Sequence, residues 1–182
     1  MRRVGVLAAL TVGLLVVGTG MALFQPWKLW VDRTVDEALP AAVAAPAPDR
    51  RGAGTTAPAP AGPVTLASGE LISHEHATSG TARLLRLPDG SRVLRLESLN
   101  TSNGPDLRVW LTDRQVVPDS AGWHVFDDGA HVSLGKLKGN HGNQNYPVPA
   151  GLDLTRYLSV TIWCDRFNVS FGAAALIPSD PI

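Results

Sequence analysis

The chain contains one cysteine, Cys164, at the end of the apolar run 159–164. In an extended strand the alternate residues Val160 and Ile162 share its face, whereas Trp163 points to the opposite face. A cysteine in such an apolar row is usually a buried, inert hydrophobe. In an exported protein, an unpaired thiol can instead be a redox group, a cofactor ligand or half of an intermolecular disulfide. The sequence leaves both readings open.

Two of the five histidines have a spacing that could serve a metal. His74 and His76 flank Glu75, so on a strand both imidazoles would face the same way. Two histidines without a third ligand are more typical of solvated residues at the end of a strand. No metal site is therefore predicted.

Composition and motifs exclude several function classes. From residue 64 onward there are ten Lys/Arg and twelve Asp/Glu (10 − 12 = −2), so the region lacks the basic patch that nucleic-acid binding requires. The sequence contains no nucleophile elbow, zinc-protease motif, phosphate-binding glycine loop or dinucleotide fingerprint. Nothing supports a hydrolase, and the sequence leaves open whether the protein is an enzyme.

The N-terminus resembles a membrane span. Residues 4–24 carry no charge, and at about 1.5 Å per residue they cover about 30 Å, the thickness of a bilayer's hydrocarbon core. A cleaved signal peptide has the same outline, with Arg2 and Arg3 before an apolar run. This run is longer than the apolar core of a usual signal peptide, which has about 7–15 residues, and it ends in the bulky Phe24. We therefore predict an uncleaved transmembrane signal-anchor over residues 1–24, with cleavage as the alternative.

Residues 25–39 repeat apolar side chains at helical spacing. Trp27 and Trp30 suit the headgroup layer, and Lys28 can extend its amine toward water. The pattern predicts an amphipathic juxtamembrane segment that continues the anchor. The alternative is a docking helix for a membrane partner.

Charge around the anchor indicates its orientation. Arg2, Arg3 and the amino terminus precede it, while Lys28 and Arg33 follow it, so the positive-inside rule slightly favours a cytoplasmic N-terminus. A signal-anchor arrangement has the same orientation. We expect a single-pass protein of the cell membrane whose C-terminal part is extracytoplasmic.

Residues 40–63 contain six Pro, nine Ala and three Gly among 24 residues. Such a segment cannot bury enough apolar surface to offset the entropy of ordering. The composition predicts a disordered Pro/Ala linker that acts as a spacer between anchor and domain.

Residues 64–182 have an all-β pattern in which short apolar runs alternate with turn clusters rich in Gly, Asn, Asp and Pro. About eight short strands at this spacing predict an antiparallel β-sandwich. The expected strands are Leu84–Leu87, Arg92–Leu96, Leu107–Thr112, Trp123–Phe126, His131–Leu134, Tyr146–Val148, Leu158–Cys164 and Asn168–Leu176.

Four segments of this domain resemble the DM-thirteen domain, also called the electron-transfer DM domain. They are HATSGTA (76–82), TSNGPDLRVWL (101–111), LGKLKGN (134–140) with GxQNY (142–146), and YxSVxIWCxRF (157–167) with FGAA (171–174). His141 and Asn143 depart from the family's pattern. The anchor and the residues after it are similar to those of membrane-anchored bacterial members of the family.

The resemblance implies a β-rich domain with one characteristic cysteine, which Cys164 matches, and a proposed role in electron transfer through a bare thiol or a bound haem. If haem binds, Cys164 is the expected ligand and His76 the first candidate for a second ligand. A membrane or envelope redox partner would then be required. The alternative is a non-catalytic module that binds an envelope polymer or protein, with Cys164 only part of the core.

Overall fold

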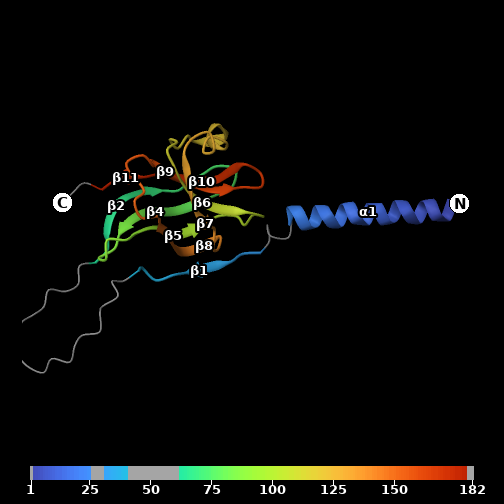
Figure 1. Ribbon diagram of the computed structural model, residues 1–182, viewed down its shortest axis with the longest axis horizontal. Coiled ribbons are helices and arrows are strands. Elements are labelled where there is room, and N and C mark those ends of the chain that lie inside the picture. The colour runs from blue at the N-terminus through green and yellow to red at the C-terminus, as the bar shows by residue number, and fades with distance from the viewer. Residues whose placement is uncertain (1, 26–30, 41–61, 180–182) are drawn as a thin grey trace, which may run out of the picture.

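The computed structural model describes residues 2–25, 31–40 and 62–179, which form one N-terminal helix and two packed β-sheets (Figure 1). Helix α1 (Arg2–Phe24) is apolar and extends from one end of the sheets, whereas β11 lies at the opposite end (Figure 1). The strands are β1 (Thr34–Asp36), β2 (Val64–Glu70), β3 (Ile72–Ser73), β4 (Ser79–Arg86), β5 (Arg92–Asn100), β6 (Leu107–Thr112), β7 (His131–Lys136), β8 (His141–Val148), β9 (Ser159–Cys164), β10 (Val169–Ala175) and β11 (Ile177–Pro178).

The two sheets confirm the predicted antiparallel sandwich. One sheet has six strands in the order β1-β8-β5-β4-β2-β11, and the other has five in the order β3-β10-β9-β6-β7. Every described pairing is antiparallel except that of β1 with β8, which is parallel. The main core lies between the sheets, because alternate residues of each strand point into that space.

The five-stranded sheet is also covered on its outer face. A second apolar cluster there contains Trp110, Phe126, Trp163 and Ala173. Phe126 belongs to the connection between β6 and β7, which includes a short 3₁₀ helix at Asp119–Gly122. As a result all six residues of the central strand β9 are buried.

Seven of the eight expected strands form, with boundaries extended or shortened by a few residues. The expected strand Trp123–Phe126 is wrong, because those residues form turns and Phe126 instead packs edge-on against Trp163 at 6.5 Å between ring centroids. Strand β2 was not anticipated, because its sequence VTLASGE is broken by small residues that give no strong period of two.

The segment after the anchor differs most from expectation. Residues 31–39 contain no helix, and Thr34–Asp36 forms β1 at the edge of the six-stranded sheet. Along β1, Thr34 and Asp36 are exposed and Val35 is half-buried. The prediction of helical structure over residues 25–39 is therefore wrong for the part that the structure describes. Trp27, Lys28 and Trp30, expected at the headgroup layer, lie outside the described residues.

This pairing changes the role of the Pro/Ala segment. β1 precedes residues 40–63 and β2 follows them, and both strands belong to the same sheet. The segment therefore connects two strands of one sheet rather than separating the anchor from the domain. Its predicted disorder concerns residues 41–61, which lie outside the described part of the chain.

Polar contacts and two glycines hold β1 against β8. The Lys138 amine donates to the Glu37 carboxylate at 2.7 Å, and the buried Asn140 side chain accepts from the Arg33 amide at 2.7 Å. A Cβ atom at Gly139 would collide with the carbonyl of Arg33, just before β1, and one at Gly142 with the carbonyl of Val35 in β1. Glycine at these positions thus permits the close approach of the two strands.

We predict that Gly139→Ala displaces β1 while the sandwich remains folded. The added methyl group would overlap the Arg33 carbonyl, and such overpacking costs about 1–3 kcal/mol. Hydrogen exchange should show loss of protection at the Glu37 amide, which donates to the Asn143 carbonyl at 2.8 Å in the native protein. Gly62→Ala, which has no atom within 4 Å of its added Cβ, is the control. Unchanged protection in Gly139→Ala would contradict the described pairing.

Candidate functional site

The Cys164 thiol lies inside the sandwich at the end of β9. Leu107 on β6 and Val169 on β10 are its cross-strand partners. The side chain has no exposed surface and belongs to the main core cluster, together with Ile162 and Phe171. The predicted alternation is confirmed, because Trp163 belongs to the cluster on the opposite face of the sheet.

Two opposing influences act on the ionisation of this thiol. Burial raises the pKa of Cys164, and the nearby Glu75 carboxylate raises it further. The backbone N–H groups of Phe167, Arg166 and Asp106 lower the pKa of the thiol, because they stabilise negative charge on sulfur. Burial dominates, so the thiol is neutral at ordinary pH.

The backbone that covers the thiol on its solvent side is the turn 165–168 between β9 and β10. All four turn residues are exposed. The Asp165 amide donates to the Asp106 carbonyl at 3.0 Å, and the Asp165 carboxylate lies 2.9 Å from Nε of Arg108. These two contacts hold the turn against the residues at the start of β6.

The same turn contacts the end of the apolar helix. Arg166 donates to the Leu23 carbonyl at 2.6 Å, and the Phe167 ring stacks on Phe24 with centroids 5.9 Å apart. A cation beside the last carbonyls of a helix also complements the helix dipole. These contacts place the Cys164 end of the sandwich next to α1.

His76 does not join Cys164. Its imidazole packs on the Phe171 ring at 3.9 Å between centroids, and its Nε2 lies 3.7 Å from the Glu75 carboxylate. No hydrogen bond or ion pair connects His76 with the thiol in the described part of the chain. His76, the predicted second haem ligand, therefore packs on the apolar cluster that contains Cys164 but has no hydrogen bond or ion pair with the sulfur.

His74 and His76 also point to different surroundings. The chain bends after β3, so the expected strand alternation does not reach these residues. His74 is buried, with Nδ1 2.7 Å from the Ser170 hydroxyl and Nε2 3.1 Å from the Val117 carbonyl. Burial lowers the pKa of His74. The expectation of a solvated histidine is wrong for His74, whose ring joins three separate segments of the domain.

Cys164 and His76 do not fit a haem as its two ligands. A ligating thiolate needs access to the iron and a lowered pKa, whereas this thiol is fully buried and its pKa is raised. Two cavities along the described residues, of about 730 and 340 Å³, are lined by neither residue. Within the same residues no group of three or more His, Cys, Asp or Glu side chains converges on a metal position.

An aromatic layer behind the thiol was not anticipated. Trp163 stacks on Trp110 at 5.0 Å, and Trp110 stacks on the exposed His131 at 4.0 Å. The indole N–H groups of both tryptophans are buried and have no hydrogen-bond partner among the described residues. The available signal was the presence of tryptophan at outward positions of two strands, where a solvated face would carry polar residues.

These features define a small β-sandwich with one buried thiol, whose turn 165–168 contacts the end of an apolar helix. Comparison with protein families matches residues 70–176 to the family described as Electron transfer DM13. The chain belongs to this family, as the sequence motifs indicated. No curated protein and no solved structure matches the chain.

Ionisation of Cys164 should reduce stability at alkaline pH. The folded thiol has a raised pKa, so above about pH 8.5 the unfolded chain releases its proton while the folded chain keeps it. Unfolding becomes more favourable, by up to about 1.4 kcal/mol per pH unit. The free energy of unfolding, measured with urea from pH 7 to 10, should therefore fall more steeply for the wild type than for Cys164→Val.

The comparison with Cys164→Val cancels other alkaline groups. Burial also raises the pKa of Tyr146, and this contribution is common to both proteins. Parallel stability curves for the two proteins would show that the folded thiol ionises in its ordinary range.

Proposed function

We propose that this protein is a membrane-tethered, extracytoplasmic electron-transfer domain in which Cys164 is the redox group. The observation that carries the proposal is the position of the thiol: it lies at the end of β9, beside the turn 165–168, and this turn contacts the end of α1. Membership of the electron-transfer family supports the redox role.

Membrane tethering rests on α1 and on its contacts. The helix is long and apolar enough to cross a membrane over Arg3–Phe24. Arg2 and Arg3 at its start favour a cytoplasmic N-terminus. β1 begins ten positions after the helix ends, so the domain stays close to the bilayer surface. Its redox partner would accordingly be a membrane or envelope protein that reaches this surface.

The chemistry available to one cysteine is thiol–disulfide exchange. After loss of its proton, the Cys164 thiolate attacks one sulfur of a disulfide on the partner; a new S–S bond forms, the partner's S–S bond breaks and a partner thiolate leaves. The Cys164 sulfur is oxidised and the departing sulfur is reduced. With no second cysteine in the chain, an external thiol must resolve the mixed disulfide. The turn 165–168 has to open for each step.

The test is the rate at which Cys164 reacts with an aromatic disulfide reagent in the full-length protein. Local opening predicts a slow reaction in native buffer that accelerates with pH and is almost independent of low urea concentrations. Asp165→Asn removes the ion pair with Arg108 that fixes the turn and should accelerate the reaction about three- to tenfold. Asp153→Asn, in an exposed turn at the other end of β9, is the matched control.

A reaction that occurs only through global unfolding would contradict the redox proposal. The rate would then follow urea with the full equilibrium m-value, and Asp165→Asn would change it no more than it changes overall stability.

Complete burial of Cys164 favours a second candidate, a non-catalytic module that binds an envelope polymer or protein. In that case the thiol is only core, and Cys164→Ala should cost around 1–2 kcal/mol of stability while partner binding is unchanged. Loss of function in a folded Cys164→Ala protein would exclude this candidate and support the redox role.

Membrane attachment makes a separate prediction. The full-length protein should remain in the membrane fraction after alkaline carbonate extraction, because residues 4–24 are held by the bilayer's hydrocarbon core. Removal of residues 1–24 should release it. Release of the intact full-length protein by carbonate would show that α1 does not span the bilayer.

A further inference from the structure

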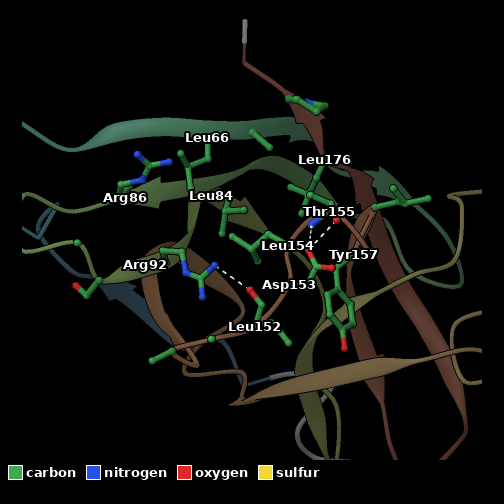
Figure 2. A pocket seen from close by; sticks show the side chains of 17 residues that line it. Leu66, Leu84, Arg86, Arg92, Leu152, Asp153, Leu154, Thr155, Tyr157 and Leu176 are labelled. Carbon is green, nitrogen blue, oxygen red and sulfur yellow. Dashed lines mark hydrogen bonds between the residues drawn. The ribbon is translucent and has the colours of Figure 1, made fainter. Parts of the chain in front are cut away.

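A cavity opens beside the segment 150–158, and Figure 2 shows the side chains that line it. It has a volume of about 730 Å³, which lies within the range of pockets that hold small molecules. Its walls are mostly apolar and include Leu66, Leu84, Leu152, Leu154, Tyr157 and Leu176. Leu158, just before β9, also lines it, whereas Cys164 ends that strand, so the two sites are about 20 Å apart.

Two arginines line the same cavity. Arg86 and Arg92 are directly opposite each other on the paired strands β4 and β5. Arg86 lies on the same face of the sheet as Leu84, and Arg92 on the same face as Leu94. Both leucines belong to the core between the sheets. Like charges at directly opposed positions destabilise a sheet. Neither arginine forms an ion pair with any carboxylate in the described part of the chain.

A second pair of opposed arginines lies on the same two strands, and this pair has a carboxylate partner. Arg83 and Arg95 are also directly opposed, on the outer face of the sheet. The Glu97 carboxylate lies between them, 3.4 Å from Arg83 and 2.8 Å from Arg95. The outer pair is neutralised by a carboxylate of the chain, and the inner pair is not.

The remaining polar groups at the cavity leave the positive charge in excess. Arg92 donates to the carbonyls of Leu152 at 2.9 Å and Pro149 at 3.2 Å, which use only part of its guanidinium (Figure 2). The Asp153 carboxylate accepts from the amide and hydroxyl of Thr155, which lower its pKa. Arg86 has no hydrogen-bond partner among the described residues. Two guanidinium groups therefore face one carboxylate that is already hydrogen-bonded.

We infer that this cavity binds an aliphatic carboxylate, with its head between Arg86 and Arg92 and its chain along the leucine-lined wall. The ligand carboxylate would occupy the place that Glu97 takes in the outer arginine pair. Guanidinium and carboxylate form strong paired hydrogen bonds, and burial of the chain supplies the apolar contribution. The inference does not depend on the redox role of Cys164.

The test uses dodecanoate carrying ¹³C at its carboxyl carbon and the full-length protein in phosphatidylcholine nanodiscs. Binding should give a carboxyl resonance that saturates at one equivalent per protein and is absent from empty nanodiscs of the same lipid. Dodecyltrimethylammonium, with the same chain length and the opposite charge, should not displace it.

The variants separate the site from partition into lipid. Arg86→Gln should weaken binding at least about tenfold, because it removes a charge-assisted hydrogen bond, and Arg86→Lys should weaken it less. Arg83→Gln, in the neutralised outer pair, should bind as the wild type does. A saturable resonance that persists unchanged in folded Arg86→Gln, or the absence of any resonance beyond that of empty nanodiscs, would overturn the inference.

Discussion

The five-stranded sheet is covered on both faces, and the positions of the other features follow from this constraint. Its inner face packs on the six-stranded sheet, while its outer face packs on the connection between β6 and β7. A central strand in this setting is buried at every position, as β9 is. The alternation along β9 therefore places the sulfur of Cys164 in one apolar layer and the indole of Trp163 in the other.

Because both faces of the five-stranded sheet are covered, the thiol is buried even though it lies at the end of a strand, next to an exposed turn. Neighbouring strands flank the whole of β9, and its last residue lies next to the exposed turn 165–168. A redox residue at the centre of the strand would require the sheet to separate. At the end of the strand it requires only a short turn to move, which is the kind of local opening with the lowest free energy.

The sandwich and the apolar helix could be predicted because their signals are local. Turn clusters such as Pro88-Asp89-Gly90 separate the strands, and the absence of charge over residues 4–24 marks the helix. The site could be predicted only in part. Cys164 was found because it is the single cysteine, and its face because strands alternate. Its burial depends on the turn beyond it, and the separation of His76 from the sulfur depends on the bend after β3; neither has a local signal.

The edge strand was missed for a related reason. Thr34–Asp36 makes its hydrogen bonds with residues more than a hundred positions away, and nothing in its own three residues requires them. The helical spacing of the preceding tryptophans suggested a different structure. The inner arginine pair could not be predicted for the same reason, because Arg86 and Arg92 become neighbours only when β4 and β5 pair. In each case the deciding partner is distant in sequence.

The place of β1 in the chain bears on how the domain would respond to proteolysis. Pro/Ala-rich segments that join a membrane anchor to a folded domain are common points of cleavage, and a cut there normally sheds the domain from the cell. In this protein a cut within residues 40–63 would leave β1 on the anchor side and β2 on the other, with both strands still in one sheet. If α1 spans a membrane as proposed, the severed domain would stay there through the hydrogen bonds of β1 and the contacts of Arg166 and Phe167 with the end of α1, as a non-covalent complex of two fragments.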